Sequence, residues 1–75
     1  MKGFIELEYF NGELDVDAYF GKRLIQIKNI VDIDYNDTQF YTMVFYHDYK
    51  NVHMIKTLYK YEEIKELIKQ SQNEN

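Results

Sequence analysis

Asn11-Gly12 stands between two runs in which apolar and acidic residues alternate, within the stretch Phe4–Phe20. An Asn-Gly pair in this setting is the strongest short-range signal for a tight β-hairpin, because both residues accept the positive φ of the turn. A two-residue loop at this point puts Phe10 opposite Glu13 and thereby sets every other cross-strand pair. The pattern therefore predicts a first hairpin with strands at residues 4–10 and 13–20.

This register sorts the side chains of the hairpin onto two faces. Glu6 lies opposite Asp17 on one face, and Glu8 lies opposite Asp15. Like charges placed directly across a strand pair are destabilising, so we expect a partner to neutralise them. The other face is apolar and is expected to enter the core through Ile5, Leu7, Tyr9, Leu14, Val16 and Ala18.

The acidic face is the candidate partner-binding surface. Its predicted residues are the four carboxylates and the aromatic residues that frame them: Glu6, Glu8, Asp15, Asp17, Phe4, Phe10 and Tyr19. One alternative is that nearby bases neutralise the acids within the chain, namely Lys2, Lys22, Arg23 or Lys28. A second alternative is a helical turn over residues 15–21 capped by Asp15, which would scatter the carboxylates.

Three further strands are predicted, at residues 24–35, 39–47 and 52–58. The alternation in the first of them is disturbed at residues 28–30, which indicates a bulge or a one-turn kink. The second is apolar or aromatic on both faces, as is typical of a central strand. Residues 48–51 read as a type I turn with Asn51 in the left-handed region, and this loop places His47 opposite His53.

The period changes after Tyr59. Tyr61, Ile64, Leu67 and Ile68 form one apolar stripe at helical spacing, with charged residues between them. We expect an amphipathic helix at residues 60–70 that covers one face of the sheet. The predicted fold is α+β, an antiparallel sheet of about five strands with one C-terminal helix, in a single domain at residues 1–70 followed by a polar tail at 71–75.

The second half of the chain resembles known small proteins. The run LIQIKNIVDIDY, an aromatic strand and then VHMIKTLYKYEEIKELIK is similar to many small phage and prophage proteins, and in layout to FlbD-like proteins of flagellar operons. The likeness covers residues 24–69, with residues 4–9 as a possible first strand. It implies a small sheet-plus-helix protein of a mobile element. By class, it also implies a protein that acts by occupying a host enzyme.

Composition and charge narrow the classes of function. The chain has no Cys and a net charge of −4. Residues 1–37 hold eight acids against four bases, whereas residues 38–75 hold five of each. This imbalance argues against direct nucleic-acid binding and leaves room for a basic protein partner. With no signal peptide and no apolar run of membrane-spanning length, we expect a cytoplasmic protein, in the host cytoplasm if it is phage-encoded.

No set of residues predicts catalysis, a cofactor or a metal. The one Ser lies in the polar tail, and no nucleophile has a base at a catalytic spacing. His47 and His53 could hold a metal, but zinc sites use three or four ligands. The spacing of Asp32, Asp34 and Asp37 resembles a calcium loop but lacks its central Gly and final Glu.

The sequence therefore predicts a non-enzymatic, acidic interaction protein. It could act as a phage-type inhibitor that occupies a basic nucleic-acid-binding surface of a host protein, such as a CRISPR-type nuclease. The alternative is a self-associating structural or regulatory protein, FlbD-like and without an inhibitory role. This alternative rests on the strand at residues 39–47, which is apolar on both faces although one helix covers only one of them.

Overall fold

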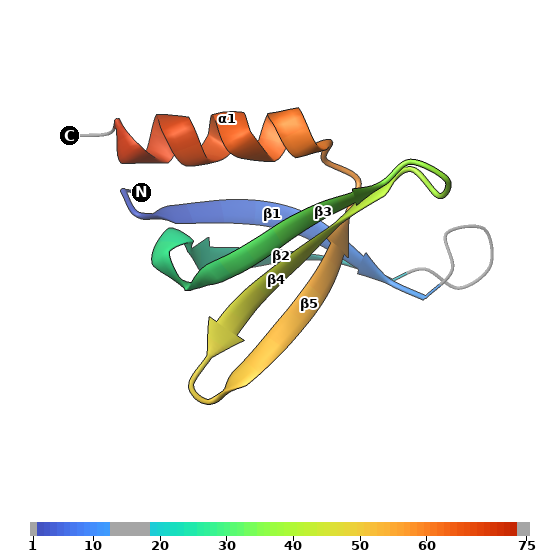
Figure 1. Ribbon diagram of the computed structural model, residues 1–75, viewed down its shortest axis with the longest axis horizontal. Coiled ribbons are helices and arrows are strands. Elements are labelled where there is room, and N and C mark those ends of the chain that lie inside the picture. The colour runs from blue at the N-terminus through green and yellow to red at the C-terminus, as the bar shows by residue number, and fades with distance from the viewer. Residues whose placement is uncertain (1, 13–18, 74–75) are drawn as a thin grey trace.

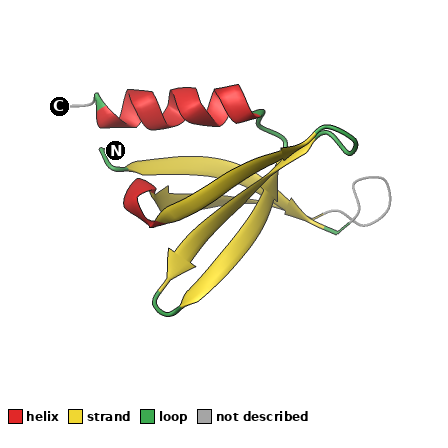
Figure 2. Ribbon diagram, in the orientation of Figure 1, coloured by secondary structure: helices red, strands yellow, loops and turns green. Residues whose placement is uncertain are grey.

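The computed structural model describes residues 2–12 and 19–73. It contains a five-stranded antiparallel sheet with the strand order β2-β1-β5-β4-β3 and a C-terminal helix, which confirms the predicted α+β layout (Figures 1 and 2). A short 3-10 helix, η1, lies between the second and third strands. The elements are β1 (Phe4–Asn11), β2 (Tyr19–Gln26), η1 (Ile27–Asn29), β3 (Ile30–Asn36), β4 (Tyr41–Asp48), β5 (Asn51–Thr57) and α1 (Tyr61–Gln72).

The register of the first hairpin differs from the prediction. Phe10 pairs with Phe20, and Glu8 pairs with Lys22. The turn still begins at Gly12, which has a φ of +86°. However, β2 starts at Tyr19, so the loop is longer than the two residues predicted. This register pairs Ile5 with the equally buried Ile25, and the packing of that pair explains why it is favoured.

Residues 24–35 form two strands rather than one. Ile27, Lys28 and Asn29 make the 3-10 turn η1, where the sequence indicated a kink, and the chain then enters β3. The backbone N–H of Ile27 donates a 2.8 Å hydrogen bond to the carbonyl of Gly3, so the turn is attached to the start of β1. A register shift between Ile30 and Asp32 adds a bulge at the start of β3.

The two halves of the sheet meet through very little backbone pairing. β1 and β5 pair in register only at Phe10 and Lys56, and the β1–β2 hairpin crosses the β3–β4–β5 strands obliquely (Figure 1). Between the two halves lies one apolar core. Its buried members are Ile5, Leu7, Ile25, Val44, Tyr46, Ile55 and Ile64.

Helix α1 closes this core. Ile64 is fully buried against the strands, and Leu67 and Ile68 pack beside it, as the helical period predicted. The helix continues to Gln72, past the predicted end at residue 70. Ser71 is buried, and its Oγ accepts a 3.0 Å hydrogen bond from the backbone N–H of Gly3. This bond joins the two ends of the chain.

The β4–β5 hairpin is shifted by one residue from the prediction. Asp48 pairs with Asn51, so the loop has two residues rather than three. The positive φ lies at Tyr49, at 56°, and not at Asn51. As a result His53 pairs with Tyr46 and not with His47, which pairs with Val52. The two histidines therefore project from opposite faces of the sheet, and the predicted His47–His53 pair is wrong.

We expect Tyr49→Gly to stabilise the protein by about 0.5 kcal/mol. A left-handed conformation costs a non-glycine residue about 1 kcal/mol, and part of that gain is lost to the backbone entropy of glycine. Tyr49 is 99 % exposed, so its side chain contributes no packing. Urea denaturation measures the change. The matched control is Lys50→Gly, which relieves no positive φ and should destabilise; equal effects of the two substitutions would contradict the account.

Candidate functional site

The predicted acidic ladder does not form. Glu6 pairs with Leu24, and Glu8 pairs with the base Lys22, so neither has an acid across the strand. Asp15 and Asp17 lie outside the described residues. The structure therefore keeps two of the four predicted carboxylates, exposed on the same face of β1.

The three aromatic residues of the predicted site are separated. Phe4 is half-buried and Phe10 is only 2 % exposed, so Phe10 is part of the packed interior and not an exposed anchor. Tyr19 is 73 % exposed and pairs with Asn11, which places it on the opposite face of the hairpin from Phe10. Instead, Phe20 lies beside Phe10, with ring centroids 6.2 Å apart.

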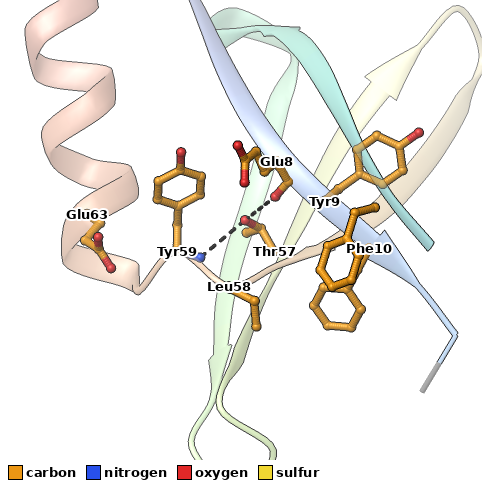
Figure 3. Close-up of a pocket in the computed structure, with 8 residues that line it drawn as sticks. Glu8, Tyr9, Phe10, Thr57, Leu58, Tyr59 and Glu63 are labelled. Atoms are coloured by element: carbon orange, nitrogen blue, oxygen red, sulfur yellow. Dashed lines mark hydrogen bonds between the residues drawn. The ribbon is translucent and has the colours of Figure 1, made fainter. Parts of the chain in front are cut away.

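A groove opens where β1 and β5 diverge, and we take it as the candidate site (Figure 3). It has a volume of about 290 Å³ and is lined mainly by apolar surface. Phe10 and Phe20 form one wall, and Leu58, which follows β5, lies at the other. The full lining, here called the β1–α1 groove, is Glu8, Tyr9, Phe10, Phe20, Thr57, Leu58, Tyr59 and Glu63.

Two buried threonines position the walls of the groove. Thr57 donates a 2.7 Å hydrogen bond from its hydroxyl to the backbone carbonyl of Glu8, and its Oγ accepts a 3.3 Å bond from the backbone N–H of Tyr59 (Figure 3). The Thr42 hydroxyl donates a 2.6 Å bond to the Tyr59 carbonyl. These bonds hold the β5–α1 connection against β1 and β4, so the groove is a fixed feature of the backbone.

Two carboxylates stand at the groove, Glu8 from β1 and Glu63 from the first turn of α1. Glu63 Oε1 accepts a 2.9 Å hydrogen bond from the backbone N–H of Lys60, which caps the helix and fixes the side chain. Neither carboxylate forms an ion pair with another of the described residues. Glu63 also lines two neighbouring shallow hollows, one with Glu66 and one with Glu62, so the acidic surface extends along α1.

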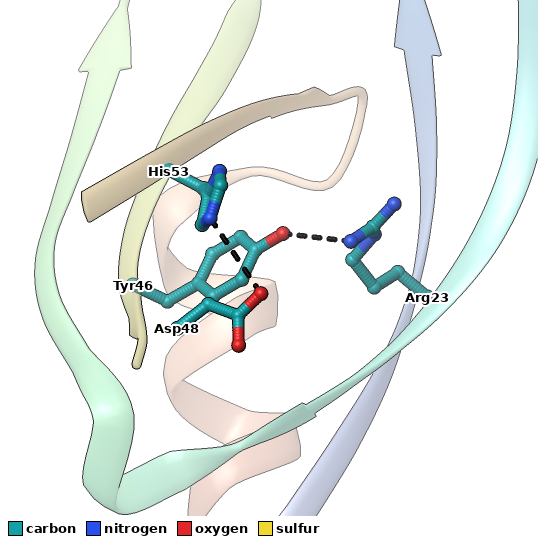
Figure 4. A network of polar contacts seen from close by, with 4 residues as sticks. All are labelled: Arg23, Tyr46, Asp48 and His53. Carbon is teal, nitrogen blue, oxygen red and sulfur yellow. Dashed lines mark hydrogen bonds and ion pairs between the residues drawn. The ribbon is translucent and has the colours of Figure 1, made fainter. Parts of the chain in front are cut away.

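A second polar cluster lies away from the groove, where β2 faces β4 (Figure 4). Arg23 donates a 2.9 Å hydrogen bond to the Tyr46 hydroxyl and stacks 5.3 Å from the centre of the Tyr9 ring. His53 lies next to Tyr46 and contacts Asp48, with Nε2 and Oδ2 3.6 Å apart. Asp48 and His53 project from the same face of the β4–β5 hairpin, which allows this contact.

Arg23 acts as a structural cross-link. Side-chain hydrogen bonding to Tyr9 is the main cause that raises the pKa of its guanidinium above the usual value, with Tyr46 adding to it and partial desolvation opposing it. An arginine guanidinium is always charged in proteins, so this group is a permanent cation at the β2–β4 contact. The cluster therefore ties β2 to β4 through a charge-assisted hydrogen bond.

The described residues contain no group of three or more His, Cys, Asp or Glu side chains placed to hold a metal ion. Within the same residues, no helix has the length and apolar character needed to cross a membrane. Comparison of the chain with protein-family models, with curated proteins and with solved structures gave no match. The resemblance to small phage and FlbD-like proteins stays a prediction.

Of the eight residues that line the groove, only Glu8 and Phe10 were among the predicted site residues, and the six that sequence reasoning missed include Phe20, Leu58 and Glu63. Glu63 is one of the charged residues between the positions of the apolar stripe, and its distance from Glu8 depends on where α1 packs, which the sequence pattern does not show. Leu58 carried a signal that could have been used, since it is an apolar residue between β5 and the helix that is 53 % exposed.

We expect Tyr46→Phe to destabilise the protein by about 1 kcal/mol, because it removes the acceptor of the Arg23 hydrogen bond while keeping the buried ring. Arg23→Met should cost about 1–2 kcal/mol, since it also removes the contact with Tyr9. Thermal and urea unfolding measure both. Lys22→Met is the control, because its side chain projects to the other face of β2, and a loss as large as that of Arg23→Met would disprove the cross-link.

Proposed function

We propose that this protein is a non-enzymatic interaction module that binds a basic segment of another protein in the β1–α1 groove. The observation that carries the proposal is the position of Glu8 and Glu63 at a groove with apolar walls. A lysine or arginine side chain has a long apolar stem and a cationic head, and this combination of walls and carboxylates is complementary to both parts.

The surroundings of the groove support a protein partner. Phe20 is 66 % exposed and Leu58 53 % exposed, so two large apolar side chains from opposite walls of the groove are open to a partner. Aromatic and aliphatic residues of this kind are frequent anchors at interfaces. The acids around them give long-range attraction for a basic partner, and the net charge of −4 adds to it.

Proteins that bind nucleic acids are the class of partner that fits best. They expose arginine and lysine side chains together, in grooves that normally hold phosphates. An acidic protein that occupies such a groove excludes the nucleic acid. We therefore retain the proposal of an inhibitor of a host nucleic-acid-binding protein, now based on Glu8 and Glu63 rather than on a ladder of four acids along the first hairpin.

The test is titration of the ¹⁵N-labelled protein with an oligo-arginine peptide, followed by NMR. We expect the shifts to concentrate on the groove, at Glu8, Phe20, Leu58 and Glu63. The double substitution Glu8→Gln and Glu63→Gln should weaken binding by about three- to tenfold, as expected for the loss of two partly solvated ion pairs. Glutamine can still accept the capping bond at residue 63, so the fold is retained.

The matched control changes the net charge by the same amount elsewhere. Asp32→Asn and Asp34→Asn remove two exposed acids of β3, which lie outside the groove. We expect this variant to bind the peptide nearly as tightly as the unmodified protein does. If both double variants weaken binding equally, or if the shifts spread evenly over all acidic residues, attraction to net charge alone explains the result and the groove is not the site.

A further inference from the structure

The outer face of the β3–β4–β5 strands carries an ordered pattern of charge. Directly opposite residues of antiparallel strands project to the same side, so the pairings define rows across the sheet. In one row Asp34 pairs with Met43, and Met43 pairs with Lys56. In the next row Asp32 pairs with Phe45, and Phe45 pairs with Met54. Acids therefore stand on β3, apolar side chains on β4, and a base on β5.

Among the described residues no helix covers this outer face, although Phe10 packs against Tyr41 at its β1 edge. Helix α1 packs through Ile64 into the core on the opposite side of the sheet. Met54 is 42 % exposed and the neighbouring Val52 is 54 % exposed, while Met43 and Phe45 are half-buried. The face thus presents a central apolar strip with unlike charges on its two sides.

The position of Lys56 is also defined. Its Nζ lies 5.4 Å from the centre of the Tyr41 ring, on β4, so the cation is held over this face of the sheet. Neighbouring strands are about 4.8 Å apart, which puts the acidic column on β3 and Lys56 on β5 about 10 Å from each other. Among the described residues neither Asp32 nor Asp34 forms an ion pair with Lys56, so both charges are open to a second molecule.

We propose that this outer face is a self-complementary interface between two copies of the chain. When two identical sheets stack face to face, their two-fold axis lies between them, either along the strands or across them. An axis along β4 places β3 of one copy over β5 of the other, so Asp34 meets Lys56 twice and Met43 and Phe45 meet their own counterparts. An axis across the strands would put Asp34 against Asp34. The charge pattern selects the first arrangement.

Sedimentation of charge-exchange variants tests this arrangement. In the dimer described, Asp34→Lys alone creates two lysine–lysine contacts, and Lys56→Glu alone creates two acid–acid contacts. We expect each variant to dimerise at least about tenfold more weakly than the unmodified protein. When the two variants are mixed in equal amounts, a heterodimer of one copy of each has unlike charges at both contacts between positions 34 and 56. We expect this heterodimer to be about as tight as the homodimer of the unmodified protein.

Several results would overturn the proposal. These are an unmodified protein that stays monomeric up to sub-millimolar concentration, single variants that dimerise as it does, or a mixture that stays as monomeric as its components. Circular dichroism establishes that each variant is folded.

A second pair of variants keeps the test independent of the charges. Met54→Gln replaces an apolar side chain of the strip by an uncharged polar one and should weaken dimerisation, whereas Leu24→Gln should not, because Leu24 is similarly exposed but lies on β2. Equal effects of the two substitutions would also refute the interface. The readout is the oligomeric state, so failure here leaves the groove proposal untouched.

Discussion

The separation of β1 from β5 after one backbone pair is the constraint on which the rest of the structure depends. The two strands pair at Phe10 and Lys56, and beyond that point the Thr57 hydroxyl, bonded to the Glu8 carbonyl, replaces further ladder bonds. The opening left on the inner side is filled by Ile64 of α1, which is fully buried. At the same divergence the β1–α1 groove opens. The divergence of β1 from β5 thus makes room for Ile64 in the core and also creates the groove that we take as the candidate site.

The register of the first hairpin determines what the acids can do. With Lys22 across from Glu8 and Leu24 across from Glu6, the repulsion that a row of opposed carboxylates would create is absent. Glu8 is then one acid at the edge of an apolar groove. The second acid of the same groove is Glu63, which lies on α1, near the other end of the sequence. An attractive surface for a basic partner therefore arises from tertiary packing and not from the hairpin alone.

Elements with a strong period were predictable from sequence. The stripe of Ile64, Leu67 and Ile68 predicted the helix, and the kink predicted at residues 28–30 overlaps the end of η1.

The lengths of the hairpin loops were not predictable from the sequence. Asn11-Gly12 marks a turn, but the loop that follows is longer than two residues. The packing of Phe10 against Phe20 stabilises the observed register more than a two-residue loop would stabilise the predicted one. Tyr49 accepts a positive φ although its side chain disfavours it, which shifts the second hairpin by one residue. The groove is formed by segments that lie far apart in the sequence, and the spacing of residues within one segment does not predict which other segments it contacts.

The most direct test of this account is an NMR measurement of which rings contact Phe10. The structure places its ring centroid 6.2 Å from that of Phe20 and 5.8 Å from that of Tyr41, so nuclear Overhauser effects from Phe10 to both rings are predicted. A tight two-residue loop at Asn11-Gly12 would instead place Phe20 opposite Gly3. Contacts between Phe20 and Gly3, without contacts from Phe10 to Phe20, would contradict the register on which the groove and its carboxylates depend.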